Sequence, residues 1–361
     1  MRIKGAFRTV IGTLFRWLPL SVEPGLRIFG HPTEESPVFV TANFDLTVKR
    51  VTRHLRNLDC YLLVAPTGGI NVWCAAAGDN FTAHSVISAI KTSGISDKVA
   101  TRTLILPQLA APGVDVELVK KETGWNCKFG PVYAVDIPEY VANGFKKTDN
   151  MRRVRWPLGE RLDIGFGVST PMLLAVLIIL AIFMRSWLEE FTALGFGLVI
   201  LMFGFYPLIP GKAAWHKLLF VEGLIGIGLL VYILTAVDRT GYILNLFFWS
   251  MGLVLFIGID FAGTTPFQKS QLDPWLDRLG IRRIGPVNFT SRAKIITSKI
   301  ILNQAKCTAC GICYDVCPMG VYDVEKDQHQ KVVVKYPERC EACEACVLQC
   351  PEGALSFGAQ F

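Results

Sequence analysis

Residues 60–81 read CYLLVAPTGGINVWCAAAGDNF and carry the clearest signal for a fold class in this chain. The first part, CYLLVA (60–65), is a short, continuous apolar run of the kind that forms a buried strand. Glycines then predict a turn, and Asn71 is a candidate cap for a helix that starts within NVWCAA. A strand, a loop and a helix in this order are typical of α/β sheets, which bind ligands in such loops. Cys74, beside Trp73, is therefore a candidate ligand-binding residue.

The flanking sequence repeats this alternation of strands and helices. TAHSVISAIKTSG (82–94) and DVELVKKETG (115–124) are predicted helices, each closed by a glycine. TRTLILP (101–107) and PVYAVDI (131–137) are predicted strands. Strands that alternate with helices of this length indicate a parallel sheet, so we expect a Rossmann-like α/β domain over residues 1–157.

Four apolar segments follow, and each is close to the ~20 residues that a helix needs to cross a bilayer. The hydrophobic content of 51% and the mean hydropathy of +0.38 are also high for a soluble protein. We therefore expect a transmembrane domain of four helices over residues 158–265. The segments are roughly 164–184, 191–209, 218–237 and 242–262.

Basic residues flank these apolar segments. The chain has a formal net charge of +7, and much of the excess lies in KK (146–147), RRVR (152–155) and RR (282–283). This positive-inside pattern predicts a multi-pass protein of the cell membrane with its N- and C-terminal domains in the cytoplasm, and it disfavours nucleic acid as a partner. Residues 1–20 are expected to form an amphipathic helix on the membrane surface, with an ordinary surface helix as the alternative.

Eight of the eleven cysteines lie between Cys307 and Cys350, in two copies of the motif C-x2-C-x2-C-x3-C-P. Three thiolates spaced in this way bind one [4Fe–4S] cluster, and the fourth, before proline, binds the other. Zinc ligands do not show this interleaved repeat. The region resembles the bacterial two-cluster ferredoxins, so residues 266–361 are expected to be a linker and an α+β ferredoxin domain. The expected ligands are Cys307, Cys310, Cys313 and Cys350 for the first cluster, and Cys317, Cys340, Cys343 and Cys346 for the second.

The motif NVWCAA (71–76) resembles the cap-helix motif of the mercury-methylating corrinoid proteins. LPQLAAPGV (106–114) and FGPVYAVDIPEYV (129–141) resemble later sheet loops of that family. The same domain is similar to the corrinoid domain of the corrinoid iron–sulfur protein of acetyl-CoA synthesis. The mercury-methylating proteins join a corrinoid domain to a membrane domain and work with a separate two-cluster ferredoxin. The resemblance therefore implies that this chain fuses both partners.

The resemblance also implies that Cys74 is the lower cobalt ligand of a base-off, cobalamin-type corrinoid. A helix N-terminus stabilises the thiolate that such a ligand requires. Without the resemblance, a small buried hydrophobic residue would be the simpler interpretation of Cys74. His84 is a candidate polar neighbour of the site, while Cys60 and Cys127 are expected to be structural. The residues expected to contact the corrinoid are Thr67, Gly68, Gly69, Asn71, Val72, Trp73, Cys74, Ala75, Ala76, Pro107, Gln108, Leu109, Gly130 and Pro131.

The implied function is that of a membrane-anchored, corrinoid-dependent methyltransferase. In the implied cycle the ferredoxin clusters reduce cobalt to Co(I), which takes a methyl group from a methyl-pterin or a methyl-donor protein. Methyl-Co(III) then passes the methyl group to an acceptor. The implied partners are a low-potential electron donor, membrane lipid, and Hg(II) or another soft acceptor.

Two departures from the mercury-methylating family concern the acceptor. Ala77, Gly78 and Asp79 stand where that family usually has glycine and lysine, and no cysteine pair follows Cys350. Two alternatives therefore stay open. One is a corrinoid methyl carrier with an acceptor other than mercury, and the other is a membrane-bound electron-transfer protein of the ferredoxin type without corrinoid.

Overall fold

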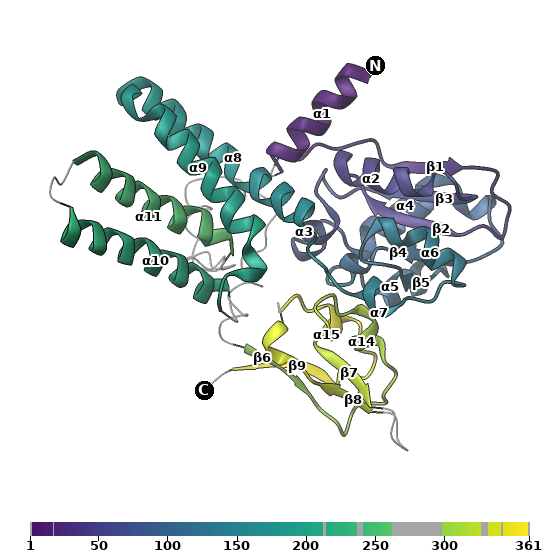
Figure 1. The fold of residues 1–361 in the computed structure, drawn as a ribbon. Coiled ribbons are helices and arrows are strands. Elements are labelled where there is room, and N and C mark those ends of the chain that lie inside the picture. The colour runs from purple at the N-terminus through teal and green to yellow at the C-terminus, as the bar shows by residue number, and fades with distance from the viewer. Residues whose placement is uncertain are drawn as a thin grey trace, which may run out of the picture. The chain divides into compact units, whose positions relative to one another are not determined.

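The computed structural model of this chain describes residues 2–16, 18–211, 214–236, 241–261, 298–325, 331–340 and 342–359. The chain divides into two compact units (Figure 1). One unit is helical and combines residues 1–18 with 156–266. The other combines residues 19–155 with 267–361 and holds the sheet and the cysteine motifs. The expected linker before residue 298, with its arginine pair at 282–283, lies outside the described residues.

The sheet has five strands in the order β1-β3-β2-β4-β5. β2 pairs in parallel with β3 and β4, and β4 with β5, while β1 runs antiparallel to β3 at one edge. Every residue of β2 and β3 is buried, which is the pattern of parallel strands covered on both faces. The strands are β1 (Gly25–Phe29), β2 (Val38–Ala42), β3 (Cys60–Ala65), β4 (Thr103–Leu106) and β5 (Asn126–Phe129).

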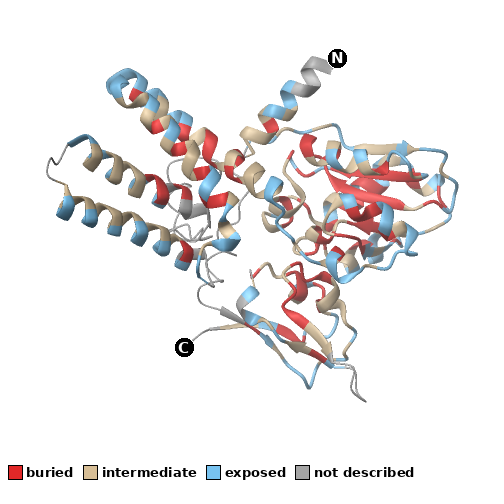
Figure 2. Ribbon diagram, viewed as in Figure 1, coloured by how far each residue is buried: buried red, intermediate tan, exposed pale blue. Residues whose placement is uncertain are grey.

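Helices cover both faces of the sheet, because successive residues of a strand point to opposite sides. On one face, Leu63 belongs to a core that includes Val86 of α4. On the other, Leu62 belongs to a core with Val48 of α2 and Tyr140 of α6. Figure 2 shows these buried strands in red between the helices. The helices of this domain are α2 (Asp45–Leu55), α3 (Val72–Ala77), α4 (Ala83–Ser93), α5 (Val116–Thr123), α6 (Ile137–Ala142) and α7 (Asp149–Arg152).

Most predicted elements form close to the expected residues. β3 matches the strand predicted at 60–65, and β4 lies within 101–107. α4 and α5 lie within the two predicted helical segments. Thr82 and Ser85 form a capping box at the start of α4, and Gly94 closes that helix with a φ of 66°.

The strand predicted at 131–137 is wrong. Residues Ala134–Asp136 form a short 3₁₀ helix, and Ile137 begins α6 with Pro138 in its first turn. Proline suits this position because the first turn of a helix leaves its N–H groups unpaired in any case. The last strand is instead β5, whose sequence NCKF is only partly buried and therefore gives a weak apolar signal. β1 and β2 are not among the strands predicted from the sequence.

In the helical unit, α8 packs against α9, α10 packs against α11, and α9 also contacts α11. Leu173, Phe203 and Val254 belong to its core. α1, the helix expected within residues 1–20, lies against α8, and Arg16 pairs with Asp163 at 2.6 Å. The helices are α1 (Arg2–Leu14), α8 (Leu158–Phe183), α9 (Leu188–Gly204), α10 (Ala214–Thr235) and α11 (Gly241–Phe261).

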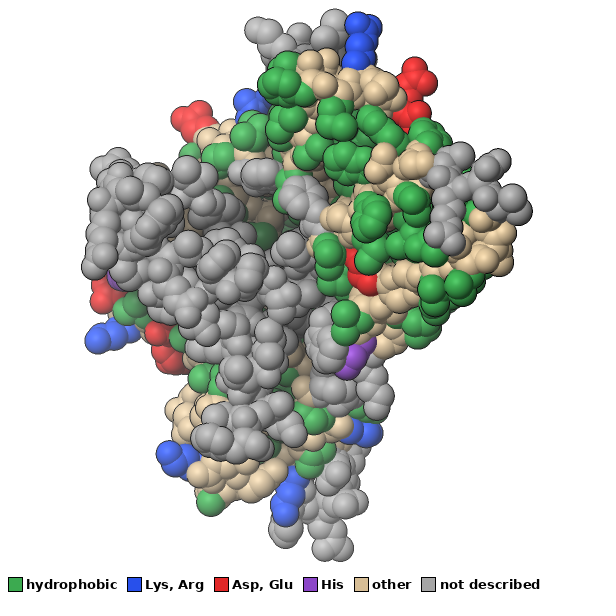
Figure 3. All heavy atoms as spheres, turned by 90° about the vertical axis from the view of Figure 1, so that its left-hand side faces the viewer, with side chains coloured by type: hydrophobic (Ala, Val, Ile, Leu, Met, Phe, Trp, Pro, Cys, Tyr) green, Lys and Arg blue, Asp and Glu red, His purple; other side chains and the backbone are tan. Residues whose placement is uncertain are grey.

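Within the described residues of this unit, three stretches are long and apolar enough to cross a membrane: Leu158–Phe183, Arg185–Gly204 and His216–Thr235. In the described part of the fourth expected segment, the apolar stretch Gly241–Leu255 is shorter. Large apolar side chains such as Ile182 of α8 and Leu234 of α10 are 68% and 73% exposed. Figure 3 shows hydrophobic side chains gathered on the described surface in the upper part of the view.

The cysteine-rich module consists of two antiparallel ribbons and two short helices. β6 pairs with β9, and β7 pairs with β8. Cys313 lies in α14 and Cys346 in α15, and the two helices contact each other. The elements are β6 (Ser298–Leu302), α14 (Ile312–Val316), β7 (Tyr322–Glu325), β8 (Lys331–Val334), α15 (Ala345–Leu348) and β9 (Leu355–Ala359).

Candidate corrinoid and iron–sulfur sites

The carboxyl ends of the parallel strands bring part of the predicted site together. Thr67 follows β3, Gln108 follows β4, and Gly130 follows β5. Because parallel strands end at the same edge of a sheet, the loops that follow them lie on one side of the domain. α3 contacts the 3₁₀ helix Gln108–Ala110, so the residues predicted around Cys74 lie close to those predicted around Gln108.

Asn43, at the end of β2, organises the loop that precedes α3. Its Oδ1 atom accepts hydrogen bonds from the backbone N–H of Thr67 at 3.0 Å, the hydroxyl of Thr67 at 2.9 Å and the N–H of Gly69 at 2.8 Å. Asn43 and Thr67 are both buried, so these bonds satisfy groups that water cannot reach. Asn43 is not among the site residues predicted from the sequence.

Gly69 lets this loop pack closely against the segment that precedes β1. Its φ is +74°, and a Cβ atom there would lie 2.8 Å from the backbone nitrogen of Ser21. Gly68 also has a positive φ, of +67°, but it is exposed, and a Cβ atom there would meet only side-chain atoms at 3.7 Å or more. Thr67 and Gly69 therefore shape the loop, while Gly68 leaves its outer side open to a ligand.

Cys74 lies in the first turn of α3, as predicted. Asn71 caps the helix, and its Oδ1 atom accepts the backbone N–H of Cys74 at 3.0 Å. Ala75 and Ala76 are buried, whereas Cys74 and Trp73 are half-buried. The thiol of Cys74 is free of disulfides and partly accessible, so Cys74 is not the fully buried core residue that the simpler interpretation required.

Gln108 faces the segment that follows α6. Its Nε2 atom donates to the carbonyl of Arg152 at 2.7 Å, and its Oε1 atom accepts from Lys147 at 3.1 Å. Gly130 and Pro131 are buried at the edge of the sheet, while Pro107 and Leu109 are half-buried. Of the residues predicted to contact the corrinoid, Gly68 is exposed, and Asn71, Val72, Trp73, Cys74, Pro107 and Leu109 are half-buried, while the others are buried.

Cys60 and Cys127 lie in strands, and His84 lies in α4. Cys60 is at the opposite end of β3, and burial with the nearby charge of Asp59 raises the pKa of its thiol to about 12. Burial likewise raises the pKa of Cys127, in β5, to about 12. Both thiols therefore stay protonated at neutral pH, in keeping with a structural role. His84 is exposed on α4.

The eight motif cysteines fall into two groups in space. Cys313 interacts electrostatically with Cys307, Cys310 and Cys350, which we call together the first cysteine set. Cys346 interacts with Cys317, Cys340 and Cys343, which complete the second cysteine set. This partition agrees with the one expected from the spacing of the motifs.

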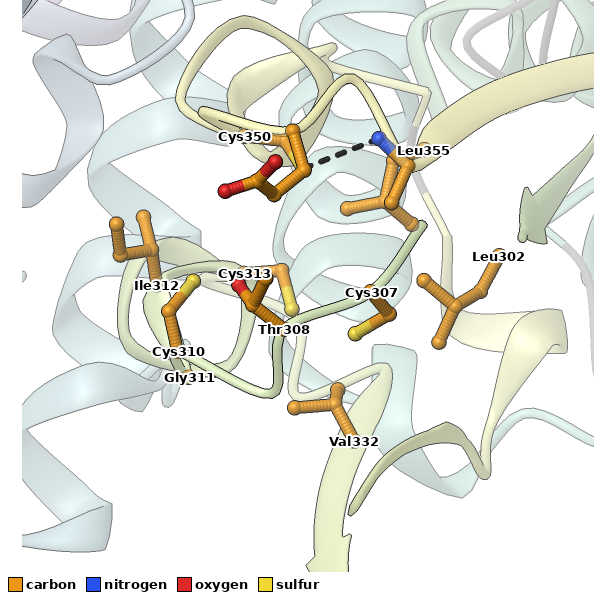
Figure 4. A pocket seen from close by; sticks show the side chains of 12 residues that line it. Leu302, Cys307, Thr308, Cys310, Gly311, Ile312, Cys313, Val332, Cys350 and Leu355 are labelled. Carbon is orange, nitrogen blue, oxygen red and sulfur yellow. Dashed lines mark hydrogen bonds between the residues drawn. The ribbon is translucent and has the colours of Figure 1, made fainter. Parts of the chain in front are cut away.

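A cavity lies among the sulfurs of the first cysteine set (Figure 4). All four cysteines of this set line it, together with apolar side chains that include Leu302, Val332 and Leu355. Among the described residues, no three His, Cys, Asp or Glu side chains converge closely enough to hold a single metal ion. Four thiols around one cavity are the donor set that a [4Fe–4S] cluster requires.

Hydrogen bonds to sulfur occur in both sets. The backbone N–H of Ala354 donates to Cys350 at 3.3 Å, and that of Val321 donates to Cys317 at 3.5 Å. Burial raises the pKa of Cys313 to about 12 and also raises that of Cys346. Such thiols ionise at neutral pH only when a metal takes the place of the proton, so they are suited to ligation rather than to nucleophilic chemistry.

The fold and the cysteine sets together define a multidomain chain in which an α/β domain accompanies a ferredoxin-type domain. Residues 7–141 match the family model of the CO dehydrogenase/acetyl-CoA synthase delta subunit. Residues 306–354 match that of the 4Fe-4S dicluster domain. The second region is thus a 4Fe–4S ferredoxin domain.

Curated relatives are gamma subunits of the acetyl-CoA decarbonylase/synthase complex. The Methanopyrus kandleri protein is 42% identical over 126 residues, which are 34% of this chain and 27% of that protein. The Methanocaldococcus jannaschii protein is 39% identical over 132 residues, or 36% and 26%. The chain therefore spans about a quarter of the length of these relatives. The matches support the expected relation of the α/β domain to the corrinoid iron–sulfur protein of the acetyl-CoA pathway.

Proposed function

We propose that this chain is a membrane-anchored, corrinoid-dependent methyltransferase that carries its own electron-transfer module. The observation that supports this proposal most strongly is the position of Cys74. Its half-buried thiol lies in the first turn of α3, beside the loops that follow β3 and β4, in the same compact unit as the cysteine-rich module. An electron-transfer protein without corrinoid would account for the two cysteine sets but not for this arrangement around Cys74.

The residues around α3 fit a corrinoid. When bound, the corrinoid supplies a cobalt centre that accepts a methyl group and passes it on. Cys74 would bind cobalt from below, and the cap from Asn71 to the N–H of Cys74 fixes the turn that carries the thiol. Asn43 fixes the preceding loop through Thr67 and Gly69, so the binding surface is largely formed before the cofactor arrives.

Two [4Fe–4S] clusters would occupy the module, one on each cysteine set. Each set offers four thiols, and the backbone N–H groups that already point at sulfur would stabilise the negative charge of a bound cluster. An external low-potential electron donor would supply the module, and the module would supply the corrinoid site.

The helical unit would anchor the chain in the cell membrane, with both terminal regions in the cytoplasm. Its apolar stretches and exposed apolar side chains support this proposal. Part of the basic excess near residue 150 is used within the protein, because Lys147 pairs with Asp315 and Arg155 with Asp136. Lys146 is exposed and still contributes to the positive-inside pattern.

The methyl donor would be a methyl-pterin or a methyl-donor protein, and the acceptor would be a soft nucleophile or soft metal ion. Hg(II) is the acceptor that the motif NVWCAA suggests, and the relatives from the acetyl-CoA pathway favour a methyl carrier with another acceptor. Anaerobic incubation of the methylated protein with Hg(II), and separately with thiol acceptors, distinguishes these two possibilities by the methylated product that forms.

The proposal as a whole is tested by cobalt binding. The chain is purified without oxygen, incubated with hydroxocobalamin and a reductant, desalted, and analysed for cobalt, iron and sulfide. About one cobalt per chain, retained through desalting, is expected for a dedicated site. Full iron and sulfide content without retained cobalt would favour the electron-transfer protein instead.

A further inference from the structure

The two cysteine sets differ in their surroundings. The sulfurs of the first set accept backbone N–H groups from Ala309, Tyr314 and Ala354, and no side-chain donor among the described residues. In the second set, the buried hydroxyl of Tyr322 donates to Cys346 Sγ at 3.0 Å. Hydrogen bonds to a ligand sulfur stabilise the reduced, more negative form of a cluster and so raise its reduction potential.

Cys317, in the second set, has a further source of positive potential. The backbone N–H of Val321 donates to its sulfur at 3.5 Å, and the guanidinium of Arg153 interacts with it electrostatically. Arg153 lies against Gly320, since a Cβ atom on that glycine would come within 2.9 Å of its Nε atom. Arg153 belongs to the α/β domain, so a residue of that domain interacts electrostatically with a ligand sulfur of the cysteine-rich module.

The second set also lies beside further contacts to the α/β domain. Gln349, which follows the helix of Cys346, is 6% exposed, and its Nε2 atom donates to the carbonyls of Ala111 at 2.9 Å and Val114 at 2.7 Å. The backbone N–H of Val154 donates to the carbonyl of Pro318, next to Cys317, at 2.8 Å. The loop of Ala111 and Val114 in turn packs on α3, because a Cβ atom at Gly113 would lie 2.7 Å from the carbonyl oxygen of Ala76.

The first set is the more exposed of the two, although α14, which carries Cys313, also contacts the α/β domain through Tyr314 and Asp315. Cys310 is exposed, whereas Cys317 and Cys346 of the second set are buried. A reductant that docks on the module therefore reaches this set without passing the α/β domain.

We propose that the two sets have different roles in electron transfer, with the first set as the entry point and the second set as the exit toward α3. This inference builds on the clusters of the proposed function. A one-electron donor of low potential is oxidised by one electron, and the cluster of the first set is reduced. That electron then moves to the cluster of the second set, which has the higher potential, and the first is reoxidised. Because its reduction potential is higher, the cluster of the second set retains the electron, and this set lies beside the α/β domain.

The test uses the purified full-length chain with its clusters and without corrinoid, so a failure to bind corrinoid does not affect it. Redox titration is followed by electron paramagnetic resonance. Cys310→Ser and Cys343→Ser assign the two signals, because each alters or removes the signal of its own set. A dysprosium chelate in solution then reports which cluster is nearer to solvent.

The signal altered by Cys343→Ser should have the higher midpoint potential and the weaker response to dysprosium. Tyr322→Phe and Arg153→Gln should each lower that midpoint potential. A tenfold loss in the equilibrium constant for one-electron reduction corresponds to a decrease of about 59 mV. Tyr336→Phe is the control, because its side chain hydrogen-bonds with Lys335 rather than with a ligand sulfur. The proposal is overturned if the higher potential belongs to the signal altered by Cys310→Ser, or if Tyr322→Phe and Arg153→Gln shift neither signal or both equally.

Discussion

The side chain of Asn43 shows how much of the proposed corrinoid site depends on one buried residue. It holds the loop before α3 through Thr67 and Gly69, which are 24 and 26 positions away along the chain. No local pattern in the sequence links these positions. Cys74, by contrast, is recognisable from the motif around it, because its position depends mainly on a helix cap three residues earlier.

The three cysteines outside the motifs should differ in their reactivity toward iodoacetamide. The thiolate is the nucleophile, and a thiol with a pKa of about 12, such as Cys60, is almost entirely protonated at pH 8. Cys60 is also 0% exposed, whereas Cys74 is half-buried. We expect Cys74 to be labelled in the corrinoid-free native chain at pH 8, and Cys60 only after unfolding.

Labelling is measured by mass spectrometry of peptides over a series of pH values. In the native chain, labelling of Cys60 should rise only as the pH approaches 12; in unfolded chain it should follow the ordinary thiol pKa of 9.0. Equal labelling of Cys60 and Cys74 in the native protein at pH 8 would contradict this account of burial.

At the level of the elements, α3 is the part of the fold most closely tied to the proposed function. It is only six residues long, and Asn71 supplies its cap. The helix that follows, α4, is capped in a similar way by Thr82 but lies farther along the chain from Cys74. Removing each cap in turn therefore distinguishes an effect on the position of the Cys74 thiol from an effect on the stability of the fold.

Asn71→Ala and Thr82→Ala should each destabilise the protein by about 1 kcal/mol, the usual cost of losing a helix cap. Only Asn71→Ala should also change the visible spectrum of the bound corrinoid, because it frees the turn that holds Cys74. Denaturant unfolding of the cofactor-free chain measures the first effect. An unchanged spectrum in Asn71→Ala, or an equal change in Thr82→Ala, would count against a role of this cap in cobalt ligation.

Strongly apolar elements could be predicted from the sequence, and weakly apolar ones could not. β3 is buried along its whole length, so its run of apolar residues is continuous. β5 is partly exposed at the edge, and the more apolar segment after it becomes a 3₁₀ turn and a helix that starts at Ile137. The choice depends on Pro138 and on tertiary contacts, which a local apolar pattern does not report. The cysteine sets were predictable because ligand spacing is itself local.

At the level of the whole molecule, the α/β domain and the cysteine-rich module form one compact unit although the apolar helices separate them in the sequence. Side-chain contacts hold them together. Lys147 has a side chain that is only 4% exposed, and it pairs with Asp315 at 2.9 Å. Arg152 lies over the ring of Tyr314 at 4.3 Å. None of these pairings is visible from the order of the residues.

Gln349→Met should loosen this association, because it leaves the buried carbonyls of Ala111 and Val114 without their donor. The loss of such bonds costs about 1–3 kcal/mol for each unpaired group. We expect faster amide hydrogen exchange in residues 110–114. Gln304→Met is the matched control, since Gln304 bonds to the carbonyl of Val332 within the module. Equal exchange in the two variants would mean that Gln349 does not hold the domains together.

The helical unit should behave as an integral membrane anchor. After cell lysis without oxygen, the chain should sediment with membranes, resist extraction with alkaline carbonate, and dissolve in a mild detergent. The physical reason is that apolar stretches such as Leu158–Phe183 are favoured in hydrocarbon over water. Release by carbonate or by high salt alone would indicate a peripheral protein and would contradict the proposed spans.

The most direct test of the central claim is the cobalt spectrum of the corrinoid-loaded chain beside those of Cys74→Ala and Cys127→Ala. Cys127 is the control because it is also a half-buried, free cysteine, but it lies in β5. If Cys74 is the lower ligand, visible absorption and Co(II) paramagnetic resonance should change in Cys74→Ala and remain as in the wild type in Cys127→Ala. Cobalt spectra that are identical in all three proteins would show that Cys74 does not bind the metal.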